Sequence, residues 1–233
     1  MSWTVESEAR ARRFVLKILL ADKCHCSGCG ACVAACSVGA LRMQEDSDGF
    51  AMPVILRDKC VSCGKCVRAC PVVRPDKTLK RDDFLQEAVF FAGQLVDKEQ
   101  LKNVSSGGAY WALAQAFVSE GGVVYGVRQF GVDEVRHCRA TTLDEARCCC
   151  RSKYLPSNAY DVYPLVKRDL ENDQRVLFTG VACQVAGLYG YLGRHYDNLV
   201  TFEVVCHGIP SLKAWRLYRE ELERAKGKCL VDL

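Results

Sequence analysis

Eight cysteines in the first third of this chain form one spacing pattern that occurs twice. The first copy consists of Cys26, Cys29, Cys32 and Cys36, and the second of Cys60, Cys63, Cys66 and Cys70. Both follow C-x2-C-x2-C-x3-C, and each cysteine of the second copy stands 34 positions after its counterpart. Three thiols of each copy therefore lie on one tight loop. A segment with this pattern is expected to fold around a group that binds thiolates.

The doubled spacing is typical of the bacterial two-cluster ferredoxins, in which the fourth cysteine of each run ligates the other [4Fe–4S] cluster. This crossing rule assigns Cys26, Cys29, Cys32 and Cys70 to one cluster, named cluster one. It assigns Cys60, Cys63, Cys66 and Cys36 to cluster two. Two [4Fe–4S] clusters are thus the expected cofactors.

Other uses of these cysteines fit less well. Structural zinc favours two C-x2-C pairs that are separated by a longer loop. Disulfides need an oxidising compartment, and we expect no signal peptide before the first run. The first ligand of cluster one stays open between Cys24 and Cys26, and only Cys26 keeps the spacing to Cys29.

Composition argues against a nucleic-acid-binding protein and against a membrane-spanning one. Sixteen cysteines in 233 residues are far above ordinary usage, and a net charge of +4 is too small to indicate nucleic-acid binding. The apolar run from Phe14 to Leu20 is interrupted by Lys17 and is too short to span a bilayer. We therefore expect a cytoplasmic protein without a membrane span.

Three regions are predicted along the chain. The first, residues 1–21, contains a short amphipathic helix over 5–20, and the second, residues 22–75, is the two-cluster ferredoxin-type unit. A polar linker over 74–83 leads to the third region, residues 84–233. In the ferredoxin-type unit, two strands over 40–43 and 50–55 flank a turn. Residues 84–233 alternate between strands and helices, which favours an α/β domain with a mainly parallel sheet. The predicted strands cover 88–92, 123–127, 135–140, 175–179 and 199–205. The predicted helices cover 108–119, 143–147, 162–170, 184–192 and 212–225.

Three segments follow strands or begin helices in the α/β domain, where such sheets collect ligands. The first is Ser105, Ser106, Gly107 and Gly108, whose hydroxyls and backbone N–H groups suit a phosphate or, more simply, an N-cap. The other two contain Cys183 and Cys206. Each of these is a candidate ligand or reactive thiol, with a packed core cysteine as the alternative.

The order of these motifs, with Ser152-Lys153-Tyr154 and Cys206-His207-Gly208, resembles the coenzyme F420 hydrogenase/dehydrogenase β-subunit family from about residue 22 onward. The resemblance implies an iron–sulfur flavoprotein that carries FAD. It implies that Ser105 to Gly108 and Ser152, Lys153 and Tyr154 contact the flavin nucleotide. It also implies that Cys183 and Cys206 help to hold a third [4Fe–4S] cluster.

The chain departs from the family in three places. It has Gly180-Val181-Ala182-Cys183-Gln184 where the family has Gly-Thr-Pro-Cys-Gln, and Arg151 where the family has glycine. It also ends near Cys229, before a segment with a further cysteine pair that family members commonly contain. We therefore expect a shortened or split member, whose third cluster needs ligands from another subunit.

The predicted function is electron transfer between the clusters and a flavin, which reduces or oxidises a two-electron acceptor such as coenzyme F420. The expected partner is a ferredoxin or a hydrogenase-type redox subunit, and the oligomeric state stays open. The alternative is a two-cluster electron carrier subunit without flavin and without enzymatic activity.

Overall fold

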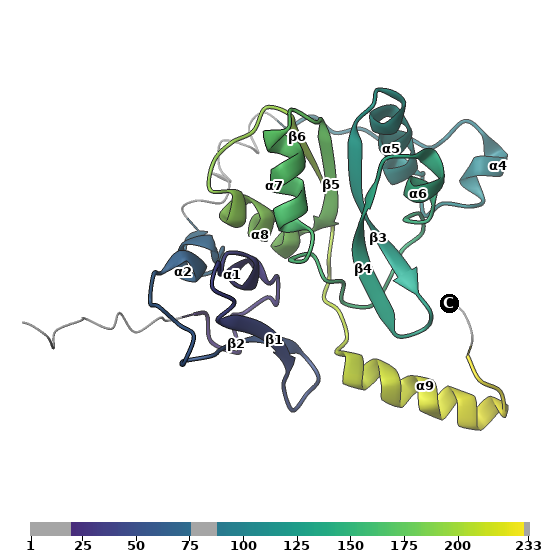
Figure 1. The fold of residues 1–233 in the computed structure, drawn as a ribbon. Helices are drawn as coiled ribbons and strands as arrows, with labels where there is room; N and C mark the ends of the chain where they lie inside the picture. Colours follow the sequence, from purple (N-terminus) through teal and green to yellow (C-terminus); the bar gives the residue numbers. More distant parts are fainter. Residues whose placement is uncertain (1–19, 76–87, 231–233) are drawn as a thin grey trace, which may run out of the picture.

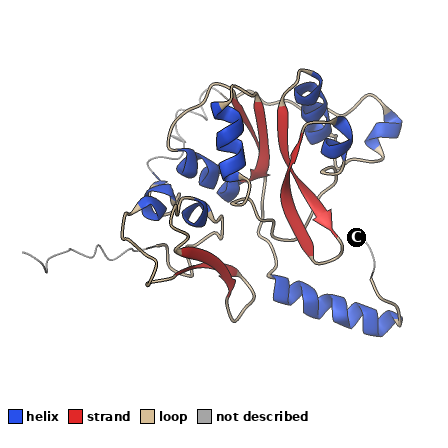
Figure 2. Ribbon diagram, viewed as in Figure 1, coloured by secondary structure: helices blue, strands red, loops and turns tan. Residues whose placement is uncertain are grey.

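A computed structural model describes residues 20–75 and 88–230 of the chain, and its ribbon is drawn in Figure 1. The predicted helix over 5–20 and most of the predicted linker over 74–83 lie outside the described residues. The cysteine-rich unit comes first, and a four-stranded sheet with helices on both faces follows it (Figure 2).

The cysteine-rich unit contains two short helices and one hairpin. Helix α1 (Ala31–Ala34) precedes β1 (Leu41–Glu45), and β2 (Ala51–Ile55) precedes α2 (Lys65–Ala69). Strands β1 and β2 pair antiparallel, as the predicted strands and turn require. Gly30 and Gly64 precede the two helices with φ of 71° and 72°, a left-handed conformation that glycine adopts without steric cost. The 34-residue sequence repeat is therefore also a structural repeat.

The second part contains four strands and six helices among the described residues. The strands are β3 (Val123–Phe130), β4 (Glu134–Ala140), β5 (Val176–Val181) and β6 (Leu199–Val204). The helices are α4 (Lys98–Leu101), α5 (Ala109–Ser119), α6 (Leu143–Arg147), α7 (Tyr163–Glu171), α8 (Ala182–Leu192) and α9 (Leu212–Lys226). The strand order in the sheet is β4-β3-β5-β6.

The sheet is mixed, with three parallel strands and one antiparallel strand. Strands β3, β5 and β6 are parallel, whereas β3 and β4 pair antiparallel. Only residues 131–133 connect β3 to β4, and a parallel pair needs a crossover of a dozen or more residues. The short connection therefore makes a hairpin, and the expectation of a mainly parallel sheet holds for three of the four strands.

The predicted strand over 88–92 is wrong. Residues 88–94 form no strand, and Phe90 and Phe91 are 88% and 92% exposed. An extended apolar run becomes a strand only when a neighbouring strand pairs with its backbone, and no strand of the described sheet pairs with this segment. The run is thus an exposed connection that leads to α4.

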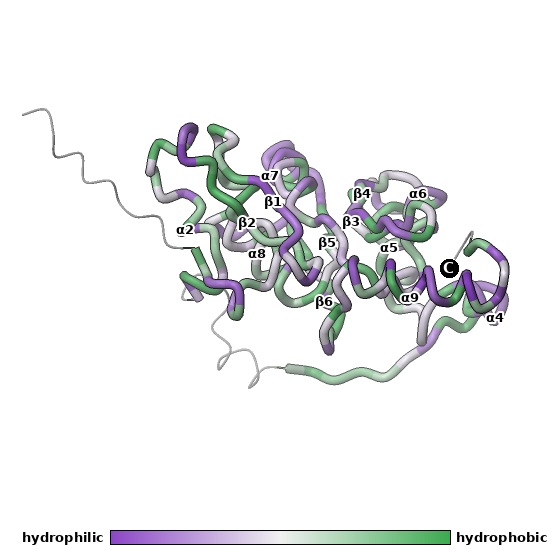
Figure 3. The backbone as a smooth tube through the Cα atoms, turned by 90° about the horizontal axis from the view of Figure 1, so that it is seen from below, coloured by the Kyte–Doolittle hydropathy of each residue, from purple (hydrophilic) through white to green (hydrophobic). Residues whose placement is uncertain are grey.

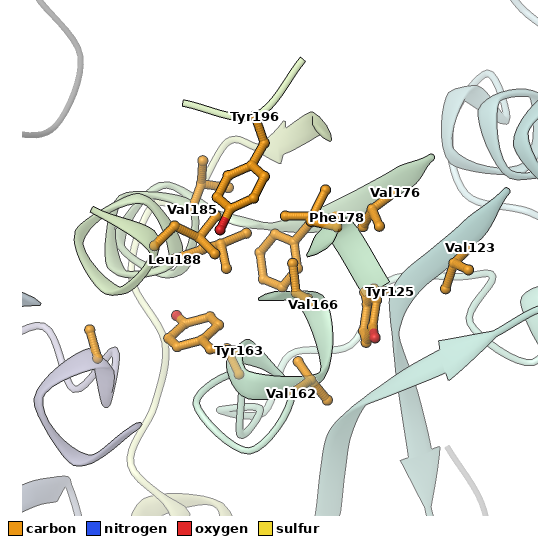
Figure 4. Close-up of a cluster of buried hydrophobic side chains, with 14 of the residues drawn as sticks. Val123, Tyr125, Val162, Tyr163, Val166, Val176, Phe178, Val185, Leu188 and Tyr196 are labelled. Carbon is orange, nitrogen blue, oxygen red and sulfur yellow. The ribbon is translucent and has the colours of Figure 1, made fainter. Parts of the chain in front are cut away.

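Two apolar layers cover the sheet, one on each face. Helices α7 and α8 pack on the first face, where Tyr125 and Phe178 meet Tyr163, Val185 and Leu188 (Figure 4). On the opposite face, α5 and α6 pack against Val124 and Leu177. Side chains of successive strand residues point to opposite faces, so β3 and β5 supply both layers.

Helix α9 lies apart from the sheet and bridges two hairpins (Figure 1). Lys213 Nζ donates to the carbonyl of Ser47 at 2.9 Å, in the β1–β2 turn. Trp215 Nε1 donates to Asp133 Oδ1 at 2.8 Å, in the β3–β4 turn. Hydrophilic and hydrophobic residues alternate along the helix (Figure 3). Helix α9 therefore connects the cysteine-rich unit to the sheet.

Within the described part of the chain, no helix combines the length and apolar character that crossing a membrane requires.

Candidate iron–sulfur and nucleotide sites

The four cysteines predicted for cluster one line a single cavity. Cys26, Cys29 and Cys32 come from the first loop, and Cys70 comes from the end of α2. Leu20, Met43, Pro53 and Val72 complete its apolar wall. The crossing cysteine thus lies with the three that precede it by more than thirty residues. Four thiols therefore line one cavity with largely apolar walls.

Burial raises the pKa of three of these thiols, Cys26, Cys29 and Cys32. Burial and then the neighbouring Cys29, Cys26 and Cys70 thiols raise the pKa of Cys32 to about 12. Burial likewise raises the pKa of Cys29 to about 11. Thiolates in such a place need a positive charge beside them, which the iron atoms of a cluster supply. The donor set therefore fits an iron–sulfur cluster.

Backbone N–H groups point at several cluster thiols. The N–H of Ala40 donates to Cys36 Sγ at 3.2 Å. The Gly28 N–H lies at the Cys26 thiol and the Val67 N–H at the Cys66 thiol, and both oppose the rise in pKa that burial causes. Hydrogen bonds of this kind stabilise thiolates and help to set the reduction potential of a cluster.

Three of the four cysteines predicted for cluster two, Cys36, Cys63 and Cys66, come together at α2. Cys66 is buried, and burial and then the neighbouring Cys36 and Cys63 thiols raise its pKa. Cys63 is exposed, in contrast to its counterpart Cys29. Ser62 adopts a φ of 53°, close to the 69° of Gly28 at the equivalent position of the first loop. The two loops therefore share one backbone path but differ in their exposure.

Cys24 stands away from the cluster-one cavity. Its side chain is exposed, and its N–H donates to Asp22 Oδ1 at 3.0 Å in a turn. Cys26 lines the cavity and Cys24 does not. Of the two rivals for the first ligand position, Cys26 is therefore the one beside the other three thiols.

Among the residues for which the structure gives positions, no three His, Cys, Asp or Glu side chains close around a point that would suit one metal ion. The thiolates of one [4Fe–4S] cluster bind to four different irons. A [4Fe–4S] cluster requires four cysteines that surround a cavity, rather than ligands that converge on a single ion.

The structure brings Cys183 and Cys206 together and sets them beside the first cysteine loop. Cys183 lies in the first turn of α8, and burial and then the Cys206 thiol raise its pKa. Cys29 is a further neighbour of Cys183, and the Ser27 hydroxyl hydrogen-bonds to both thiols. Cys229 is exposed beyond the end of α9. Two predicted ligands of the third cluster thus stand next to the cysteines predicted for cluster one.

The two segments predicted to contact the flavin also meet. The N–H of Ser152 donates to Ser105 Oγ at 2.8 Å, and the two hydroxyls lie 3.1 Å apart. Ser106 has a φ of 52° and Gly108 a φ of 80°, so the chain makes a left-handed turn before α5 begins. This turn presents the N-terminus of an eleven-residue helix.

The chain itself occupies part of this turn. The carbonyl of Gly107 accepts from the N–H of Leu95 at 2.9 Å, and a Cβ on Gly107 would overlap the carbonyl oxygen of Gly93. A Cβ on Gly108 would contact the Leu95 side chain. The two glycines therefore have a packing role, whether or not a ligand binds there.

Lys153 and Tyr154 behave differently from each other. Lys153 Nζ donates to the carbonyls of Cys149 at 2.9 Å and Arg151 at 3.1 Å, and burial lowers its pKa. The Tyr154 side chain is 79% exposed. Lys153 is thus engaged with the end of α6, while Tyr154 is open to solvent.

Three residues near the cysteines were missed by the sequence analysis. The Tyr163 hydroxyl donates to the carbonyls of Gln184 at 2.9 Å and Cys29 at 3.3 Å. Gly187 and Gly190 let α8 approach Cys29 and Ala69 closely. A pair of glycines three residues apart inside a predicted helix is the signal that indicates such an approach.

Comparison with protein families supports the first part of this description. Models of 4Fe–4S dicluster domains match residues 25–73 and residues 52–112. The second match contains only the second cysteine run, Cys60, Cys63, Cys66 and Cys70. No curated protein matches the chain. The N-terminal part is a ferredoxin-type 4Fe–4S dicluster region, so this is an iron–sulfur protein with a role in electron transfer.

Proposed function

We propose that the chain is an iron–sulfur flavoprotein oxidoreductase related to the coenzyme F420 hydrogenase/dehydrogenase β subunits. Cys26, Cys29, Cys32 and Cys70 would hold cluster one. Cys60, Cys63, Cys66 and Cys36 would hold cluster two. When bound, the two clusters supply one-electron transfer, and a flavin pairs single electrons for a two-electron acceptor.

The protein's own contribution is to position and shield the cysteines. The apolar wall from Leu20, Met43 and Val72 keeps water from the thiols of cluster one. The Ser27 hydroxyl and backbone N–H groups place partial positive charge at the sulfur atoms. Both effects tune a bound cluster without any change in its ligands.

The observation that carries the flavin proposal is the contact between Ser105 and Ser152. These residues are 47 positions apart, and their hydroxyls lie 3.1 Å from each other at the start of α5. Hydroxyls beside a helix N-terminus can donate to a phosphate, and the helix dipole favours its negative charge. The FAD pyrophosphate is the group that we assign to this place.

Cys183 and Cys206 are a second observation in favour of the same proposal. They lie beside the Cys29 loop, and so on the route from cluster one into the α/β domain. Two thiols do not complete a [4Fe–4S] site. We propose that a third cluster forms here only when a second chain or a further segment supplies the missing ligands.

One observation favours the alternative, an electron carrier subunit without flavin. Gly107 and Gly108 are already required by Gly93 and Leu95, so their presence needs no phosphate. Under this alternative, the α/β domain docks the chain to a partner, and only the clusters carry electrons.

Flavin content separates the two functions. Protein purified under anaerobic conditions is denatured, and the released flavin is measured by absorbance and fluorescence. About one flavin per chain supports the oxidoreductase. Iron and sulfide without flavin, after incubation with excess FAD, would support the carrier instead.

A further inference from the structure

The two halves of the cysteine repeat have different surroundings, and the difference points to a docking surface. The loop of cluster one packs against the α/β domain: Ala31 is fully buried, and Ser27 hydrogen-bonds to Cys183. Ser27 is exposed as well, but its hydroxyl is engaged with the Cys29 and Cys183 thiols, whereas its counterpart Val61, 34 positions later, is apolar and 64% exposed. The second copy also contacts the α/β domain, through Ala69, but it leaves Val61 and Cys63 of its loop exposed.

Charge follows the same division. Residues 26–36 contain no charged side chain, whereas residues 60–70 contain Lys65 and Arg68. Lys65 corresponds to the buried Ala31 and Arg68 to Ala34, which packs against the core. Lys65 and Arg68 are both exposed. The second copy thus carries cations at positions where the first copy has small apolar residues.

These cations lie at the cysteines themselves. Arg68 Nη1 donates to the carbonyl of Cys63 at 3.3 Å. Lys65 Nζ donates to Ser37 Oγ at 3.2 Å, beside Cys36. Among the residues that the structure places, neither cation forms an ion pair with a carboxylate. Both charges are available to a partner.

We propose that Lys59, Val61, Cys63, Lys65 and Arg68, here named the loop-two face, dock an acidic one-electron carrier protein. An apolar centre with a charged rim is the usual form of a specific protein interface, and here the exposed Val61 shares one short segment with three exposed cations. Asp58 is the one acidic residue in the segment 57–70, so the face is positive. A negative carrier is steered to such a face, with its redox centre directed to the exposed Cys63 side.

This inference rests on the proposed ligands of cluster two, and its test separates the two claims. Full-length protein is purified anaerobically, and its iron is counted before any binding measurement. An iron count well below eight per chain would reject the ligand proposal. With about eight irons present, the binding data bear on the loop-two face alone.

The probe is an acidic plant-type [2Fe–2S] ferredoxin, and the readout is its dissociation constant. At low ionic strength, the double variant Lys65→Glu/Arg68→Glu should weaken binding by about tenfold to a hundredfold, and added salt should remove most of this difference. The matched control Lys98→Glu/Lys228→Glu makes the same charge change at two exposed cations. Lys98 begins α4, at the opposite end of the molecule from α2 (Figure 1). The control should bind like the unmodified protein.

A second pair of measurements keeps the proposal open to rejection if the double variant loses iron. The unmodified protein should bind the acidic ferredoxin more weakly as salt increases, and it should not bind a basic carrier such as cytochrome c. The neutral variant Lys65→Gln/Arg68→Gln should show a smaller loss than the charge reversal. Equal affinity of the unmodified, control and reversed proteins at low salt, or binding independent of salt, would overturn the proposal.

Discussion

Gly187 of α8 lies directly against Cys29 of the first cysteine loop. A Cβ on Gly187 would come within 3.2 Å of both Cβ and Sγ of Cys29, and within 2.9 Å of the Tyr163 hydroxyl. Gly190, one turn further, lies in the same way against the backbone of Ala69, next to Cys70. Two cysteines proposed for cluster one therefore depend on the absence of side chains from one helix.

Gly187→Val should destabilise the protein and loosen cluster one. A valine at this position must push the Cys29 loop or Tyr163 aside, at a cost of about 1–3 kcal/mol. Valine has a higher helix propensity than glycine, so a loss cannot come from propensity. Ala182→Val, at an exposed position of the same helix, is the control for adding a valine to α8. Thermal unfolding and iron retention measure both effects. Equal behaviour of the two variants would mean that the Gly187 contact is unimportant.

The crossing of the fourth cysteines predicts opposite results for two serine variants. Cys36→Ser should release the cluster that Cys60, Cys63 and Cys66 hold, and leave about four irons per chain. Cys70→Ser should release the other cluster instead. Alkylation of free thiols under anaerobic conditions, followed by mass spectrometry, identifies the loop that has been freed.

Cys24→Ser is the matched control for these variants, since Cys24 is an exposed cysteine of the same segment. It should retain about eight irons and leave both loops unreactive. If Cys36→Ser instead freed the thiols of Cys29 and Cys32, the ligands would not cross.

The spacing of the cysteines predicted more than the ligands. It implied two equivalent loops, and the loops share left-handed residues at equivalent positions, such as Gly28 and Ser62. Local signals were also reliable. The predicted helix over 143–147 has the observed bounds of α6, because Thr142 and Glu145 form a capping box at its start.

Features that depend on contacts between residues far apart in the sequence could not be predicted from local sequence patterns. The apolar run 88–92 has the composition of a strand, yet no strand pairs with it. The approach of Gly187 to Cys29 joins residues 158 positions apart, and nothing near either residue indicates the other. The sequence analysis expected the Ser105 and Ser152 segments to share a ligand only because of the family resemblance, and it did not predict their direct hydrogen bond.

Ser105→Ala should lower flavin affinity about tenfold if the nucleotide binds where we propose. The change removes a hydroxyl that accepts from Ser152 and would donate to a phosphate. Ser119→Ala, at the far end of α5, is the control. Gly107 and Gly108 are unsuitable targets, because a side chain there would disturb Gly93 and Leu95. Unchanged flavin affinity in Ser105→Ala would place the nucleotide elsewhere.

Arg151→Gly should stabilise the protein by about 1 kcal/mol. Arg151 has a φ of 70°, a conformation that costs an ordinary L-residue about 1–2 kcal/mol and glycine nothing. This is the position at which the resembled family has glycine. Arg151→Ala removes the same side chain but keeps the strain, so it should not stabilise. Thermal or denaturant unfolding of the three proteins measures the difference, and equal stability of the two variants would exclude the backbone explanation.

The most direct test of the account is a count of metal and acid-labile sulfide in protein purified without oxygen. The proposed ligands predict about eight irons and eight sulfides per chain, since each [4Fe–4S] cluster contains four of each. They also predict a brown protein whose visible absorbance bleaches on reduction. Tightly bound zinc with no acid-labile sulfide would contradict the central claim, because the cysteines would then hold a structural metal rather than electron-transfer clusters.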